Sequence, residues 1–160
     1  MAKNSVRKLG SGKRNQWLKT LATDDAKTDP GNRRVLIDTN VWYGALLYGG
    51  NPELVVRRCK RYDTIVSSPY LLNKLLSLLK ERGAPYKWRN DLERVLKRMT
   101  QSFEPDDFSG ISRDPKDDPI IASAIAGGCD YLITNDGDLL ELGGYKQLKI
   151  LKPLDYLKIK

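Results

Sequence analysis

The chain alternates short apolar runs with longer segments in which apolar residues recur at helical spacing. Strands buried on both faces of a parallel sheet are predicted at Val35–Ile37, Thr64–Val66 and Tyr131–Thr134, and a further strand at Leu148–Leu151. Helices are expected at residues 41–48, 52–61, 69–82, 87–100, 119–126, 138–142 and 153–157. Strands that alternate with helices predict an α/β sandwich with a parallel sheet.

The leading segment differs from the rest in charge and composition. Residues 1–34 hold nine Lys/Arg against three Asp/Glu, whereas the remainder holds nineteen against seventeen. Only Gln16–Ala22, with Trp17, Leu18 and Leu21 on one side, has helical spacing. We expect residues 1–33 to form a basic flexible arm with one docking element, followed by one folded domain at 34–160. A basic arm suits a polyphosphate partner, and a solvated tail is the alternative.

Composition excludes several classes of protein. No apolar run approaches the roughly 20 residues that a membrane span needs, and no hydrophobic stretch follows the basic N-terminus, so we expect a cytoplasmic protein without a membrane partner. The chain has no histidine, which excludes a Ser–His or Cys–His nucleophile. Cys59 and Cys129 stand alone, which argues against zinc and predicts two small buried residues.

Acidic residues follow the predicted strands at the points where they end. Asp38 ends the first strand, Asp136 and Asp138 follow the 131–134 strand, and Asp118 opens a helix. Each alone is explained by helix capping. The carboxyl ends of parallel strands share one edge, however, so together these acids predict a cluster that needs a cation. Oxygen ligands without His or Cys indicate a hard ion, Mg²⁺ or Mn²⁺, which promotes phosphodiester cleavage.

Three stretches of the sequence resemble a known family. Residues 35–41 (VLIDTNV), 113–124 (RDPKDDPIIASA) and 130–140 (DYLITNDGDLL) are similar to the first, third and fourth motifs of PIN domains. The likeness extends over about residues 34–157 and is greatest to toxin components of toxin–antitoxin systems, the VapC-like ribonucleases.

The resemblance implies a three-layer α/β/α sandwich and a Mg²⁺- or Mn²⁺-dependent endoribonuclease acting on single-stranded RNA. Its partners would be a small antitoxin protein and a second copy in a homodimer. The residues it implies are Asp38, Asp118 and Asp136 as catalytic metal ligands with Asp138 close by, and Asn40, Thr134 and Asp117 as supporting groups.

One position departs from the family pattern. The second motif places a glutamate where this chain has Lys74. Three accounts remain open: the three Asp bind metal more weakly, the Lys74 ammonium replaces the cation electrostatically, or the side chain points to solvent. The alternative function is a catalytically impaired module that binds RNA or a partner protein without cleavage. A structure-specific DNA nuclease ranks last, because the short chain lacks clamp-like insertions.

Two predicted helices carry basic side chains that suit single-stranded nucleic acid. Arg57 and Arg58 lie on the first, and Arg89 and Lys97 on the second, which begins with Tyr86 and Trp88. Cations beside aromatic rings favour phosphate pairing with base stacking. An ordinary solvated helix face is the competing interpretation.

Overall fold

The computed structural model describes residues 11–23, 33–105 and 118–160, and its centre is a six-stranded sheet. The strand order is β3-β2-β1-β4-β6-β5, and every pairing is parallel except that of β5 with β6. The strands are β1 (Arg34–Ile37), β2 (Thr64–Ser67), β3 (Gln101–Ser102), β4 (Tyr131–Ile133), β5 (Gly144–Tyr145) and β6 (Leu148–Leu151). The predicted α/β class is confirmed.

The helices occur where the apolar spacing predicts them, with ends shifted by at most two residues. They are α3 (Thr39–Leu47), α4 (Gly50–Tyr62), α5 (Pro69–Glu81), α6 (Tyr86–Met99), α7 (Asp118–Ala126), α8 (Gly137–Leu142) and α9 (Pro153–Leu157). The prediction missed β3 and β5, because a two-residue strand is too short to show alternation. Residues 106–117, which include the start of the third motif, lie outside the described residues.

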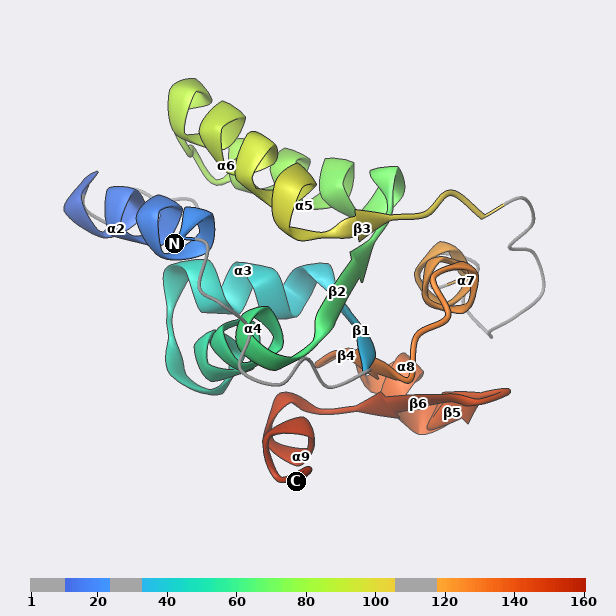
Figure 1. Cartoon of the computed structure of the whole chain (residues 1–160). Coiled ribbons are helices and arrows are strands. Elements are labelled where there is room, and N and C mark those ends of the chain that lie inside the picture. The colour runs from blue at the N-terminus through green and yellow to red at the C-terminus, as the bar shows by residue number, and fades with distance from the viewer. Residues whose placement is uncertain (1–10, 24–32, 106–117) are drawn as a thin grey trace.

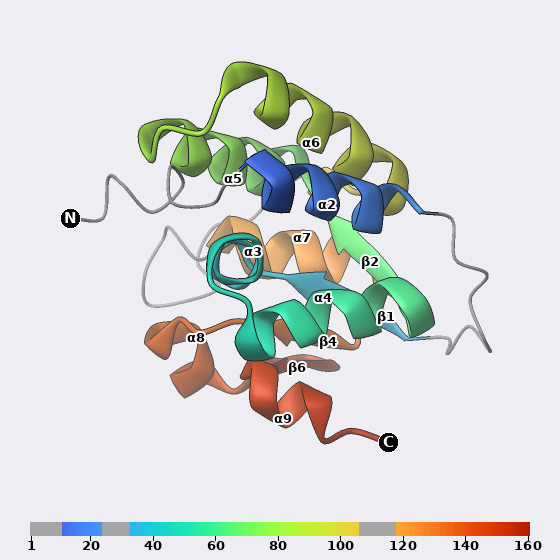
Figure 2. The same cartoon turned by 90° about the vertical axis from the view of Figure 1, so that its left-hand side faces the viewer.

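Helices cover both faces of the sheet, which gives the expected three layers (Figures 1 and 2). Within β1, Val35 and Ile37 join the core cluster that faces α3–α6, whereas Leu36 joins the cluster that faces α7 and α8. Successive strand residues point to opposite faces, so a strand covered on both sides must be apolar throughout. This explains the continuous apolar run from which the strand was predicted.

Both cysteines are buried and free, as predicted. Burial raises the pKa of the Cys129 thiol to about 12 and also raises that of Cys59. Buried thiols of this kind act as small apolar residues. Across the described parts of the chain, none of the helices has both the length and the apolar character needed to cross a membrane.

The helix predicted at Gln16–Ala22 is longer than expected and packs against the domain. Helix α2 (Ser11–Ala22) lies beside α6, and Trp17 and Leu21 are buried in the core cluster. The Trp88 indole N–H donates to the Arg14 carbonyl at 3.2 Å, and the Lys60 ammonium donates to the Thr20 carbonyl. Helix α2 therefore belongs to the folded surface that flanks α6.

Trp17→Ala should loosen α2. The change removes a buried aromatic side chain and its contact with the Arg57 guanidinium, 5.4 Å from the ring, and burial of a large aromatic side chain is worth about 3 kcal/mol. We expect faster amide hydrogen exchange across α2, with little change in β1 and β4. Lys19→Ala, at an exposed position of the same helix, is the control. Unchanged exchange in α2 would show that Trp17 does not hold it.

Candidate metal-dependent nuclease site

The site lies at the carboxyl ends of β1 and β4. These two strands are neighbours, and the chain leaves β1 toward β2 on one side and reaches β4 on the other. Ligands of open α/β sheets bind at such a reversal of strand order. Figure 2 shows α3 and α8 at this edge of the sheet.

Asp38 occupies the junction between β1 and α3. Its backbone N–H donates to the Ile133 carbonyl at 2.9 Å, which continues the pairing of β1 with β4. Its Oδ1 accepts the Thr39 N–H at 2.7 Å as the N-cap of α3. The residue is only 3% exposed, so its carboxylate depends on the Thr39 N–H and on its neighbours for solvation.

Thr134 and Asn40 fix the second oxygen of this carboxylate. The Thr134 hydroxyl donates to Asp38 Oδ2 at 2.7 Å, and the Asn40 amide donates to the same oxygen at 3.3 Å. Asn40 Oδ1 also accepts the Asn135 backbone N–H at 3.2 Å. Both residues therefore have contacts that suit the supporting roles implied by the resemblance.

Asp136 lies on the same hydrogen-bonded chain. Its backbone N–H donates to Thr134 Oγ1 at 3.0 Å, so one hydroxyl links Asp136 to Asp38. Asp136 Oδ1 caps α8 by accepting the N–H groups of Asp138 and Leu139, at 2.9 and 3.3 Å. The Asp138 side chain stands exposed in the first turn of α8.

The charges around Asp38 oppose one another. Burial raises the pKa of Asp38, and the hydrogen bonds from Thr134 and Thr39 and the charge of Lys74 act to lower it. The Asp136 carboxylate raises it further. The charges of Asp136 and Lys74, which lie on different elements, thus both act on Asp38, as expected where carboxylates gather at a sheet edge.

Lys74 lies on α5 and acts on Asp38 through its charge. It is exposed on α5, whose first turn is fixed by the buried Ser68 cap and the Leu71 N–H at 3.3 Å. Leu71, Leu75 and Leu79 form the buried face of the helix, so position 74 lies at its border. Lys74 is therefore accessible to solvent and also acts on Asp38 through its charge.

Asp118 is buried at the first position of α7, at 3% exposure. In the part of the chain that the structure describes, no three Asp, Glu, Cys or His side chains stand close enough together to hold a metal ion. Asp38, Asp118 and Asp136 therefore do not form a ready-made cage. Asp117 and the start of the third motif lie outside the described residues.

One polar group at this edge was not singled out from the sequence. The Thr39 hydroxyl is buried and has no hydrogen-bond partner among the described residues. It lines a cavity of about 10 Å³ together with Ser67 and Thr100, a size that admits roughly one water molecule. Because Thr39 and Thr100 line the same cavity, the C-terminal end of α6 adjoins the edge that carries Asp38.

The four basic residues predicted to bind RNA all have partners within the chain. Arg57 pairs with Glu53 at 2.9 Å, and Lys97 pairs with Glu93 at 3.0 Å. Arg58 donates to the Tyr156 and Ile159 carbonyls, and Arg89 donates to the Ala84 carbonyl at 3.1 Å. Each of the four therefore makes a contact within the chain, and the two ion pairs lie on exposed helix surfaces.

Residues 34–138 match the family model described as PIN domain, which covers more than half of the 160-residue chain. The chain belongs to the PIN domain family. The matched range includes Asp38, Lys74, Asp118 and Asp136, and it begins after α2.

Among solved structures, the fold is similar to a chain in the crystal structure of VapBC2 from Rickettsia felis bound to a DNA fragment from their promoter. The TM-score is 0.53 at 16% identity, over 74% of this chain and 98% of that one. A likeness at this identity shows the fold alone. No curated protein matches the sequence.

Proposed function

We propose that the protein is a metal-dependent endoribonuclease that cleaves single-stranded RNA in the cytoplasm, and that it is the toxin of a toxin–antitoxin pair. The observation that carries the proposal is the buried Asp38 carboxylate, which Thr134 links to Asp136 at the carboxyl ends of two adjacent parallel strands. The family match, and a neighbour described as a VapBC complex, support this assignment. A small antitoxin and a second copy are the expected partners.

The donor chemistry at this edge fits Mg²⁺ or Mn²⁺ in part. Asp38 and Asp136 supply carboxylate oxygens, the ligands that hard cations prefer, and Asp118 and Asp138 are the further candidates. A bound ion would supply Lewis-acid chemistry to phosphodiester hydrolysis. The protein's own part is to hold Asp38 in place through the N–H of Thr39, the hydroxyl of Thr134 and the amide of Asn40.

Removal of metal tests the proposal. Purified protein should cleave a single-stranded RNA when Mn²⁺ is present, EDTA should abolish the cleavage, and excess Mn²⁺ should restore it. Product lengths on a denaturing gel measure the reaction. Cleavage that persists in EDTA would contradict metal dependence.

A second candidate is a PIN module that binds RNA or a partner protein without cutting. Lys74 favours it, because a resident cation near Asp38 satisfies part of the negative charge without metal. The lack of a three-ligand cluster among the described residues also favours it. RNA binding in EDTA, without cleavage in excess Mn²⁺, would select this candidate over the nuclease.

A further inference from the structure

One side of α6 presents a row of cations that the fold itself does not use. At 3.6 residues per turn, Lys87, Arg94 and Arg98 fall within about 40° of one another around the helix, and we call these three residues the α6 stripe. All three are exposed. The buried face of the same helix consists of Trp88, Leu92, Val95 and Leu96.

Within the described residues the α6 stripe makes no ion pair, although Asp91 lies on the same side of the helix. Glu93 is engaged by Lys97 instead. Like charges four residues apart, such as Arg94 and Arg98, destabilise an isolated helix. The absence of ion pairs within the described ranges distinguishes the stripe from Lys97, which pairs with Glu93, and from Arg89, which donates to the Ala84 carbonyl.

The stripe begins near the candidate site and leads away from it. After α6 the chain enters β3, which pairs with the carboxyl end of β2, and Thr100 lines the same small cavity as Thr39. Arg98 is therefore the stripe residue nearest the edge that carries Asp38. Lys87 stands about 16 Å further along the helix axis, at 1.5 Å per residue.

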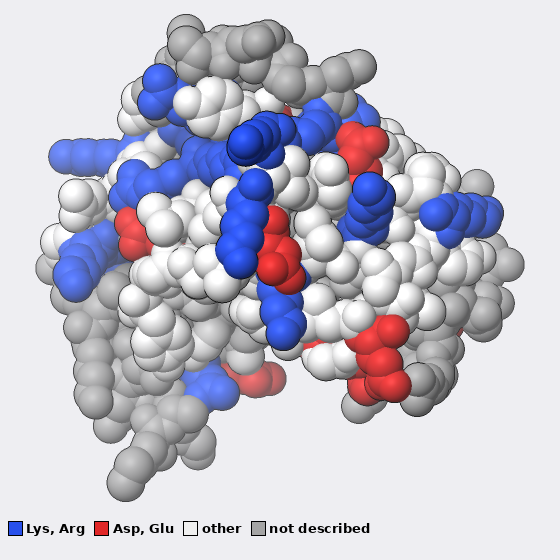
Figure 3. Space-filling model, turned by 90° about the horizontal axis from the view of Figure 1, so that it is seen from below, with Lys and Arg blue, Asp and Glu red and all other residues white. Residues whose placement is uncertain are grey.

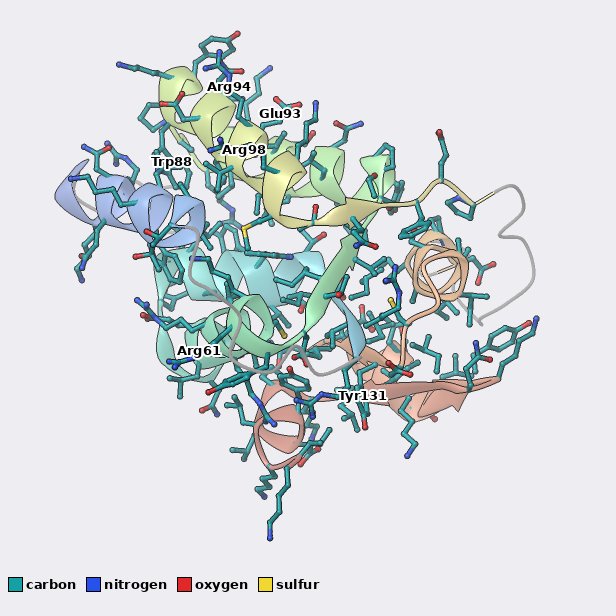
Figure 4. All side chains as sticks on the ribbon, in the orientation of Figure 1. Arg61, Trp88, Glu93, Arg94, Arg98 and Tyr131 are labelled. Atoms are coloured by element: carbon teal, nitrogen blue, oxygen red, sulfur yellow. The ribbon has the colours of Figure 1, made fainter. Side chains whose placement is uncertain are left out.

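Helix α2 extends the basic surface at the far end. A groove of about 250 Å³ between α2 and α6 is lined by Arg14, Asn15, Leu18, Lys87, Trp88 and Asp91. Figure 4 shows Arg94 and Arg98 on α6, with Trp88 between that helix and α2. The surface seen from below in Figure 3 instead carries basic and acidic side chains side by side.

An aromatic ring favours single-stranded nucleic acid over other polyanions. Tyr86 begins α6 and is 73% exposed, with the Arg89 guanidinium 5.7 Å from its ring centre. Bases stack on exposed rings of this kind, while a row of cations follows the phosphates. An acidic peptide or an anionic membrane would use the charges but would gain little from an isolated tyrosine.

We infer that the α6 stripe, with Tyr86 at its far end, binds the backbone and one base of single-stranded RNA outside the cleavage site. The inference rests on the proposed function for the identity of the polyanion. RNA bound there would run along α6 toward the edge that carries Asp38.

Binding measurements on the full chain test the inference. Fluorescence anisotropy with a labelled single-stranded RNA of about 20 nucleotides, in EDTA, would follow affinity from about 50 to 200 mM salt. The stripe variant combines Lys87→Gln, Arg94→Gln and Arg98→Gln. It should bind RNA about tenfold more weakly at the lowest salt. The slope of log affinity against log salt concentration should become smaller in magnitude by about 2, since each phosphate contact contributes about 0.7 to it. Tyr86→Ser should weaken binding without changing the slope.

The matched control removes the same charge elsewhere. Lys149→Gln, Lys152→Gln and Lys158→Gln change exposed residues of β6 and of the two caps of α9 and should leave the affinity within about twofold, apart from the small effect of net charge. Wild-type affinity in the stripe variant, or an equal loss in the control, would overturn the inference. So would equal competition by polyglutamate of matched charge or by anionic vesicles.

The two proposals fail in different ways. If wild-type protein never cleaves RNA in Mn²⁺ but the stripe variant alone loses RNA binding, the nuclease function fails and the inference stands. If Mn²⁺-dependent cleavage occurs while the stripe variant binds RNA as the control does, the nuclease function stands and the inference fails.

Discussion

Asp38→Asn should lower Mn²⁺-dependent cleavage of single-stranded RNA by about 100-fold or more, because it removes a carboxylate charge from the proposed metal site. Asn has the same shape and keeps one oxygen that can accept the Thr39 N–H or the Thr134 hydroxyl. The change therefore tests charge at this position more than packing. Initial cleavage rates at saturating Mn²⁺, compared with those of wild-type protein, measure the effect.

This variant should fold. Burial raises the pKa of Asp38, so the native state binds its proton more tightly than the unfolded state does. The ionised carboxylate therefore costs stability once the pH rises through the raised pKa, and Asn removes that cost at neutral pH. The melting temperature should not fall. Asp155→Asn, at an exposed position of α9, is the control and should cleave normally. Undiminished cleavage by a folded Asp38→Asn protein would remove Asp38 from the site.

Lys74→Glu should raise the affinity for Mn²⁺ by roughly 10- to 100-fold, the range seen when groups around a metal are changed. The substitution removes a cation that acts on Asp38 and adds a carboxylate at the border of the acidic site. Less repulsion of the incoming ion and one more oxygen donor act in the same direction. Isothermal titration calorimetry measures the affinity directly and does not depend on turnover.

Lys80→Glu provides the matched control for charge. It makes the same change at an exposed position of the same helix, six residues later and on another side. Its effect on Mn²⁺ affinity should stay within about threefold, the part due to net charge. Equal affinities of wild-type protein and Lys74→Glu would mean that Lys74 does not limit metal binding.

Much of the fold was predictable because it depends on local patterns. The apolar runs at Val35–Ile37 and Tyr131–Ile133 can only be strands covered on both faces, and the polar residues that follow them must then share one edge. The structure does bring Asp38 and Thr134 into contact, and Asp136 joins them through the same hydroxyl. The two-residue strands β3 and β5 carry no such pattern and were missed.

The contacts of the basic residues could be identified only from the tertiary structure. Nothing in the local sequence reveals that Arg58 donates to carbonyls about a hundred residues away or that Arg89 donates to the Ala84 carbonyl, whereas Arg94 and Arg98 remain unpaired within the described ranges. The contacts of a long side chain depend on how the helices pack against one another, and helical spacing in the sequence does not specify that packing.

The sequence alone therefore specified the α/β class, the order of its main elements and the edge at which the acids lie, since hydrophobic periodicity and strand direction decide these. Packing decided the rest. It buried Trp17 and Leu21 of α2 in the core, placed the charge of Lys74 within reach of Asp38, and left Asp118 outside any three-residue metal cluster among the described residues. These outcomes depend on distances between elements far apart in the chain, which only the folded molecule sets.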